Sequence, residues 1–252
     1  MSSRRSASCS RAAAYGRRAA ACAALAVLLL TAAPAASAAE PSPAAPPATG
    51  PAATSPASGE RPAAAGQSVI RGGDPVYAPG RVCTLGFNAT DGSQDYGIGS
   101  GQCLSGADTW YADAAMTVPV GTTAGASFPG NDYGLIRYTN PDVAHPGEIS
   151  TSGGPVDITG SGAPSVGSVV CHSGQVAGMQ CGTVLAVNLS VNYPDGVVHG
   201  LFSADTRAEP REGGTPAFTG STGLGFVVAS SAGTTYYQPV AEVLAAYGLT
   251  LL

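Results

Sequence analysis

The sequence contains no lysine, and charged residues make up only 11% of it. From residue 68 onward five arginines stand against fourteen aspartates and glutamates, which gives this part a formal net charge of −9 (5 − 14). Proteins that bind nucleic acids or anionic membrane surfaces do so through clusters of basic side chains. The composition therefore excludes both classes of partner and is typical of a soluble exported domain.

The N-terminal apolar run is too short to span a bilayer. Ala19–Ala33 has fifteen residues, whereas a membrane-spanning helix needs about 20. The run follows an arginine-rich start and precedes Ala36-Ser37-Ala38, which is the pattern of a cleaved secretion signal rather than of a membrane anchor. We therefore expect residues 1–38 to be a signal peptide and the protein to be secreted.

Residues 39–67 lack large apolar side chains and are rich in Ala, Pro, Ser and Gly. Such a segment buries too little surface to offset the entropy of ordering it, so we expect a disordered linker. The remaining residues 68–252, roughly 185 of them, are enough for one domain with a substantial core or for two small fused barrels.

No Cys-x-x-Cys motif is present, and the cysteine spacings do not suit zinc. We therefore expect neither a metal nor another cofactor. Cys9 and Cys22 fall in the predicted signal peptide, which leaves four cysteines for an exported domain, where an even number indicates disulfides. Three pairings are possible, and the local one joins Cys83 to Cys103 and Cys171 to Cys181.

Short apolar segments separated by turn signals dominate the chain after residue 68. The strand-like segments are Val82–Phe87, Leu135–Tyr138, Ser168–Cys171, Thr183–Asn188, Val197–Phe202 and Gly225–Ala229. This pattern predicts an all-β antiparallel sandwich or barrel. Only the end of the chain shows helical spacing of apolar residues, which predicts a helix over about 239–248, ending at Gly248.

Several motifs, in order along the chain, carry a family resemblance. They are Ile70-Arg-Gly-Gly-Asp74, Arg81-Val-Cys-Thr-Leu-Gly-Phe-Asn88, Tyr96-Gly-Ile-Gly-Ser-Gly-Gln-Cys103, Ser127-Phe-Pro-Gly-Asn-Asp-Tyr-Gly134, Cys171-His-Ser-Gly174, Glu209-Pro-Arg-Glu-Gly-Gly-Thr-Pro216 and Tyr236-Tyr-Gln-Pro-Val240. From about Val69 to its end, the chain resembles chymotrypsin-fold serine peptidases of the streptogrisin and alpha-lytic branch.

The resemblance implies two six-stranded antiparallel β-barrels with a catalytic triad in the cleft between them. The first barrel would run over about 69–146 and the second over about 147–237, followed by the C-terminal helix. The resemblance also implies the local disulfide pairing, with Cys83 bonded to Cys103 and Cys171 to Cys181. It assigns the triad acid to Asp132.

The other two triad positions lack the side chains that the serine-peptidase mechanism requires. Gln102 stands where the family has histidine, and Gly213 stands where it has the nucleophilic serine. An amide accepts no proton near neutral pH and glycine offers no nucleophile, whereas the mechanism needs both a base and a nucleophile. The sequence therefore predicts a catalytically inactive homologue.

The oxyanion region and the specificity pocket also depart from the family. Arg211 replaces a glycine whose amide would face the oxyanion, and Glu212 replaces the aspartate of a buried ion pair whose arginine position is taken by His172. We expect a Glu212–His172 pair in its place, with both side chains exposed and unpaired as the alternative. Arg207 replaces a disulfide cysteine, and the pocket wall, usually Ser-Gly-Gly, reads Val228-Ala229-Ser230.

Three functions fit these residues. The first is a secreted pseudo-peptidase, expected to be monomeric, that binds a peptide or protein in the cleft, where an exposed strand edge can accept an added strand. The second is an active endopeptidase with altered machinery, for which Thr215, His145, His172 and His199 are the available groups. The third is a structural secreted domain with an unused cleft.

Overall fold

The computed structural model describes residues 68–252. The predicted signal peptide (1–38, with Cys9 and Cys22) and the predicted linker (39–67) lie outside the described residues. Within the described range, neither helix has the length and apolar character that crossing a membrane would require.

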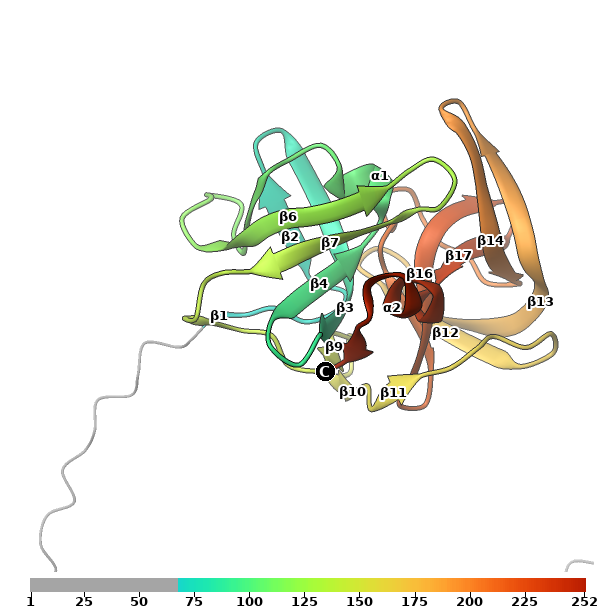
Figure 1. Cartoon of the computed structure of the whole chain (residues 1–252). Helices are drawn as coiled ribbons and strands as arrows, with labels where there is room; N and C mark the ends of the chain where they lie inside the picture. The colour runs from blue at the N-terminus through green and yellow to red at the C-terminus, as the bar shows by residue number, and fades with distance from the viewer. Residues whose placement is uncertain (1–67) are drawn as a thin grey trace, which may run out of the picture. The chain divides into compact units, whose positions relative to one another are not determined.

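The first barrel is a closed ring of six antiparallel strands (Figure 1). Its order is β3-β2-β5-β6-β7-β4, and pairing between β3 and β4 closes it. Its strands are β2 (Pro75–Ala78), β3 (Arg81–Thr90), β4 (Asp95–Gly99), β5 (Thr109–Tyr111), β6 (Pro119–Ser127) and β7 (Tyr133–Tyr138). The single tryptophan, Trp110, is fully buried in this barrel and donates its indole N–H to Thr123 Oγ1 at 2.8 Å.

The second sheet also closes into a ring, in the order β16-β15-β12-β13-β14-β17 with β16 paired to β17. Its strands are β12 (Val169–Gly174), β13 (Gly178–Tyr193), β14 (Gly196–Ala204), β15 (Pro216–Thr219), β16 (Thr222–Ser231) and β17 (Thr234–Pro239). Phe202 and Tyr237 stack at 4.8 Å in its core. The predicted all-β fold of two antiparallel barrels is confirmed.

Short strands complete the chain outside the two rings. They are β1 (Ser68–Val69), β8 (Val143–Ala144), β9 (Glu148–Ile149), β10 (Val156–Asp157), β11 (Gly160–Ser161) and β18 (Thr250–Leu251). Strands β8–β10 lie between the rings in sequence and join neither, so the boundary expected near residue 146 stays a prediction.

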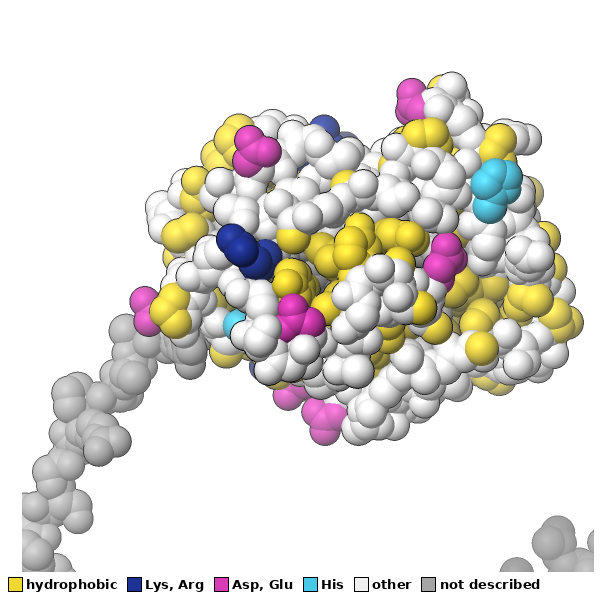
Figure 2. Space-filling model, in the orientation of Figure 1, with side chains coloured by type: hydrophobic (Ala, Val, Ile, Leu, Met, Phe, Trp, Pro, Cys, Tyr) yellow, Lys and Arg dark blue, Asp and Glu magenta, His cyan; other side chains and the backbone are white. Residues whose placement is uncertain are grey.

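The C-terminal helix α2 (Val240–Tyr247) packs where the two barrels meet (Figure 1). Val240 and Val243 are buried in one core cluster with Phe87 and Ile98 of the first barrel and Phe226 of the second. Gly248 adopts φ +67° and ends the helix in the left-handed conformation, as its position in the sequence predicts. In Figure 2 apolar side chains gather on the face around α2, and charged ones are sparse.

The prediction that only the chain end is helical is wrong, because α1 (Gly101–Leu104) forms a single helical turn. Its N-terminus is capped by Ser100, whose side chain accepts a hydrogen bond from the Cys103 N–H. Four residues are too few to show helical periodicity, which is why the apolar pattern does not reveal this turn.

Both disulfides implied by the resemblance are present. Cys83 bonds Cys103 with 5.9 Å between their Cα atoms, and Cys171 bonds Cys181 with 4.0 Å. The first disulfide ties strand β3 to α1, and the second crosses the β12–β13 pair. Disulfides of this kind form and persist in oxidising compartments outside the cytoplasm.

Candidate active-site cleft

In the first barrel, Asp132 sits just before β7 with 1% of its surface exposed. Its Oδ1 accepts hydrogen bonds from the Ser100 hydroxyl and the Gln102 backbone N–H, both at 2.8 Å. Its own N–H donates to Gln238 Oε1 of the second barrel at 3.0 Å. The acid predicted from the resemblance is therefore fixed by the N-terminus of α1 and by a contact between the barrels.

Burial raises the pKa of Asp132, because the charged carboxylate loses its water. The hydrogen bonds from Gln102 N–H, the Ser100 hydroxyl and Gly101 N–H act against this rise, since they stabilise the ionised form.

Gln102 contributes its backbone, not its side chain, to this arrangement. The side chain is exposed, while the backbone carbonyl accepts a hydrogen bond from Arg81 at 3.3 Å. Ser100 lies within the motif Tyr96–Cys103, but its role as a helix cap and as a partner of Asp132 is not among the sequence predictions. An N-capping serine is a detectable signal, but the four-residue helix behind it is not.

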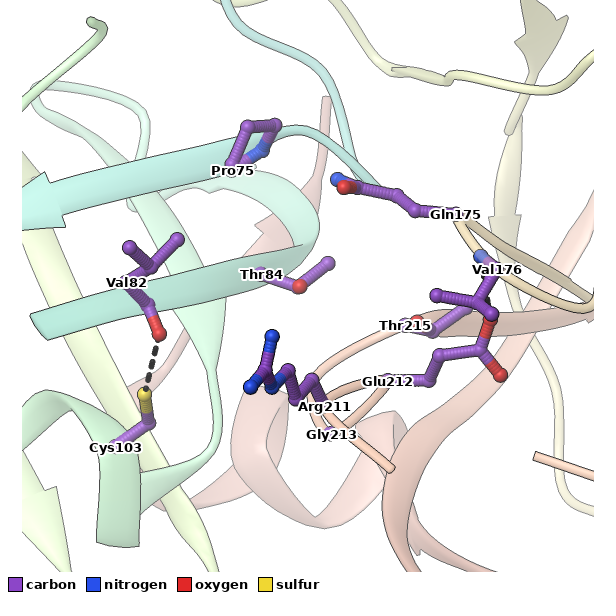
Figure 3. Close-up of a pocket in the computed structure, with 10 residues that line it drawn as sticks. All are labelled: Pro75, Val82, Thr84, Cys103, Gln175, Val176, Arg211, Glu212, Gly213 and Thr215. Atoms are coloured by element: carbon purple, nitrogen blue, oxygen red, sulfur yellow. Dashed lines mark hydrogen bonds between the residues drawn. The ribbon is translucent and has the colours of Figure 1, made fainter. Parts of the chain in front are cut away.

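On the second-barrel side, the loop Arg211–Gly213 borders a cavity of about 660 Å³ (Figure 3). The lining comes from both barrels and comprises Pro75, Val82, Thr84, Cys103, Gln175, Val176, Arg211, Glu212, Gly213 and Thr215. In Figure 3 the Arg211 guanidinium extends toward Thr84, whereas the Glu212 carboxyl group points toward Val176.

Arg211 has φ +79°, in the left-handed region that glycine adopts without strain. An L-residue there costs roughly 1–2 kcal/mol. The backbone thus keeps a conformation suited to glycine although the residue has become arginine. Arg211 also lines a second cavity of about 240 Å³, to which the predicted pocket wall Val228–Ser230 contributes as well.

Glu212 is 2% exposed, and its carboxylate accepts three backbone hydrogen bonds. Oε1 receives the N–H groups of Val176 at 2.9 Å and Ala177 at 2.8 Å, and Oε2 receives that of Glu209 at 2.7 Å. The three donors stabilise the buried oxygens without an ionic partner.

The expected Glu212–His172 pair is wrong, and so is the alternative in which both side chains are exposed. His172 is fully buried, and its Nδ1 lies 2.8 Å from the Tyr237 hydroxyl. Its Nε2 is buried without a hydrogen-bond partner among the described residues. Burial lowers the pKa of His172, with the nearby Glu212 charge acting against it, so backbone amides rather than an imidazolium neutralise Glu212.

Gly213 leaves open space at the nucleophile position. A Cβ atom built on it would meet nothing within 4 Å. Gly214, by contrast, has φ +93°, and a Cβ there would lie 2.2 Å from the Thr84 carbonyl oxygen. The loop is thus held against β3 at residue 214 while position 213 stays free to carry a side chain.

Among residues 68–252, no hydrogen bond joins any two of the groups proposed as substitute catalysts. Thr215 is buried and lines the larger cavity. His145 pairs with Asp95 at 2.9 Å on the first barrel, and exposed His199 contacts Ser190 at 2.9 Å on the β13–β14 hairpin. None of the three histidines lines either cavity. Exposed Arg207 forms an ion pair with Glu209 at 2.8 Å.

Two further contacts bear on the cleft. The Tyr193 hydroxyl donates to the Val228 carbonyl at 3.0 Å, and burial together with the Asp132 charge raises the pKa of Tyr193 to about 12. No group of three or more His, Cys, Asp or Glu residues that could hold a metal ion occurs in residues 68–252.

No protein-family model matches the chain. Individual proteins and solved structures similar to it do identify a family. Serine protease 2 of Streptomyces fradiae is 42% identical over 165 residues, which cover 64% of this chain and 95% of that protein. Streptogrisin-D of Streptomyces griseus is 40% identical over 187 residues, which cover 71% of this chain but only 47% of the relative, so the chain spans about half its length.

Among solved structures, the alpha-lytic protease homolog N4 shares 46% identity and a TM-score of 0.69, covering 73% of this chain and all of that one. With two antiparallel barrels, a buried acid that contacts the second barrel through Gln238 and these similarities, the chain belongs to the chymotrypsin-fold serine peptidases, in the streptogrisin and alpha-lytic branch.

Proposed function

We propose that this chain is a secreted, catalytically inactive serine-peptidase homologue that binds a peptide or protein segment in the cleft between its barrels. One observation carries the proposal: the cleft is open at Gly213, the nucleophile position, and no imidazole borders its cavities. The binding volume is present while the groups that would cut a bound peptide are not.

Peptide-bond hydrolysis by this mechanism needs a nucleophile and a base in contact. Removing either lowers kcat on the order of 10⁶-fold in a serine peptidase with the same triad chemistry. Here position 213 has no side chain, and the amide of Gln102 cannot replace an imidazole as base. Asp132 keeps its two donors but has no histidine to orient.

A strand edge beside the cleft supports peptide binding. Strand β15 pairs with β16 only as far as Phe226, while β17 continues along the other side of β16 to Ser231. Ala229 and Ser230 therefore have strand pairing on one side only, and they line the smaller cavity. Val228 lies at a bulge, and its carbonyl accepts the Tyr193 hydroxyl. Such an edge can hydrogen-bond an extended peptide as an added strand.

The secreted location follows from the same reading of the sequence, in which residues 1–38 act as an export signal. The two disulfides support it, because they suit an oxidising compartment.

The test combines hydrolysis and binding on the purified protein. We expect no cleavage of a broad peptide pool and no covalent labelling by serine-directed probes, but retention of peptides from the pool. The variant Gly213→Phe should abolish retention by filling the cleft, whereas the control Gly160→Phe, where a Cβ also meets nothing within 4 Å, should retain peptides normally.

Three other outcomes would contradict the proposal. Cleavage that serine inhibitors stop would show an active endopeptidase with altered machinery. Peptide retention that survives Gly213→Phe would place the binding surface elsewhere, and absence of retention would favour a structural domain with an unused cleft.

A further inference from the structure

Arg211 is the only cation among the residues that line the two cavities, and it lines both of them. Its side chain is exposed, and Figure 3 shows the guanidinium extending into the larger cavity toward the first barrel. We find no hydrogen bond or ion pair from this guanidinium to any residue between 68 and 252. A planar group with five N–H donors therefore faces the cleft with its donors available.

The carboxylates closest to Arg211 in sequence are already engaged. Glu212 points away from the cavity centre and accepts hydrogen bonds from three backbone N–H groups. Glu209 is paired with Arg207 at 2.8 Å. Neither is free to neutralise Arg211, so the positive charge in the cleft is uncompensated by these neighbours.

Most other arginines of the domain are engaged. Arg71 pairs with Glu148, and Arg81 donates to the carbonyl oxygens of Gln102 at 3.3 Å and Cys103 at 2.8 Å. Arg137 is exposed on β7, away from both cleft cavities, and has no hydrogen bond or ion pair within the described part of the chain. It is therefore a matched control for Arg211.

We propose that the cleft recognises a peptide through a carboxylate that pairs with Arg211. This inference rests on the proposed peptide-binding function and names the chemistry of the ligand. A guanidinium binds a carboxylate through two parallel N–H···O bonds, and such charge-assisted bonds are about twice as strong as neutral ones. The carboxylate is either the C-terminus of the peptide or the side chain of a Glu or Asp.

The surroundings of Arg211 suit a peptide carboxylate. Pro75, Val82 and Val176 give the cavity apolar walls, against which apolar side chains of a bound peptide can pack. The cavity volume of about 660 Å³ lies within the range of small-ligand sites. The net charge of −9 over residues 68–252 repels highly charged anions, whereas one guanidinium matches one carboxylate.

The test uses three pools of random hexapeptides passed over the immobilised protein, with retained peptides quantified by mass spectrometry. The first pool has free C-termini and no acidic side chain. The second has amidated C-termini and one Glu, and the third is identical except that Gln replaces the Glu. We expect the first or the second pool to be retained at least about 10-fold more than the third, and the preferred pool identifies the source of the carboxylate.

Three variants assign the effect to Arg211. Arg211→Gln should reduce retention of the preferred pool to the level of the third pool. Arg211→Lys, which keeps the charge but loses the planar fork, should give an intermediate value. Arg137→Gln should leave retention unchanged.

Equal retention of all three pools, or retention unaffected by Arg211→Gln, would overturn the carboxylate assignment while leaving peptide binding in place. If none of the pools were retained, the proposed function itself would fail and the carboxylate assignment with it.

Discussion

Asp132 on the first-barrel side of the cleft and Glu212 on the second-barrel side are both buried carboxylates, but they have different kinds of partner. Asp132 is held by the Ser100 hydroxyl and the Gln102 N–H at the start of α1. Glu212 is held by three amides of its own barrel, and the histidine expected beside it bonds Tyr237 instead. Asp132 is thus held by a side chain and a backbone group of the α1 turn, whereas Glu212 is held by backbone groups alone.

The two sides of the cleft therefore differ in how many residues depart from the family pattern. On the first, the predicted change is one exposed side chain, Gln102, whose backbone N–H and carbonyl are both hydrogen-bonded. On the second, the change includes a cation in a left-handed conformation at Arg211 and a vacant position at Gly213. Restoring chemistry should therefore require one substitution on the first side and two on the second.

The largest expected effect is a gain of hydrolysis in the triple variant Gln102→His, Arg211→Gly, Gly213→Ser. We expect its peptide cleavage to exceed that of the natural chain by about 10³-fold or more, because base, nucleophile and oxyanion site return to a scaffold with Asp132 in place. The measurement is turnover of a fluorogenic peptide pool.

The double variant Gln102→His, Gly213→Ser is the matched comparison, since it keeps Arg211. Equal activity of the double and triple variants would show that Arg211 does not obstruct the oxyanion site. If both variants were inactive, the first-barrel side would be less intact than its hydrogen bonds indicate.

The second effect concerns the contribution of Glu212, on the second-barrel side, to the stability of the folded protein. Glu212→Ala should lower the free energy of unfolding by about 3 kcal/mol, because it leaves three partly buried N–H groups without their acceptor. Urea denaturation measures the change. Glu209→Ala removes an exposed ion pair and should cost less than about 1 kcal/mol, so similar losses for the two variants would contradict the role given to Glu212.

The corresponding test on the first-barrel side is Asp132→Ala. We expect a loss of about 2 kcal/mol, since the Ser100 hydroxyl and the Gln102 N–H lose their shared acceptor. Asp142→Ala, at an exposed carboxyl group, serves as control and should change stability little. A loss at Asp132 as small as that at Asp142 would mean that the retained acid no longer supports the fold.

Strand patterning predicts the all-β antiparallel fold and the C-terminal helix, because both are local signals, and the family resemblance predicts the two barrels. The roles of Asp132, Gln102 and Gly213 rest on the resemblance and stay predictions. The sequence does not predict α1, since a single turn shows no period, nor the partners of Glu212. The Glu212–His172 pair was inferred by substituting one residue for another in a family contact. Backbone amides from residues 176, 177 and 209 compete for the carboxylate, and side-chain identity says nothing about where those amides point.

The pH dependence of stability tests the buried state of His172. Its folded pKa is lowered from 6.5 by burial, so the unfolded chain binds the proton first as the pH falls. The stability contributed by neutral His172 is therefore complete above about pH 6.5 and is lost below it, until the pH reaches the folded pKa.

We expect this loss to approach about 1.4 kcal/mol per pH unit within that window. Urea denaturation at several pH values should show a smaller slope for His172→Phe than for the natural chain. Exposed His199→Gln is the control and should keep the natural slope. An unchanged slope in His172→Phe would show that folding does not shift the pKa of His172 and would contradict its burial as a neutral imidazole.

The smallest expected effect is a change in stability on removing the Arg211 side chain, which measures the backbone strain at this position. Arg211→Gly should raise the free energy of unfolding by up to about 1 kcal/mol, because relief of the left-handed conformation exceeds the added entropy of glycine in the unfolded chain. Ala232→Gly, at φ +51° on an exposed turn outside the cleft, should give a similar gain. If Arg211→Gly instead destabilised the protein while Ala232→Gly stabilised it, the guanidinium would be holding the folded cleft together. A positive side chain that costs stability and gives nothing to the fold is best explained by what it binds.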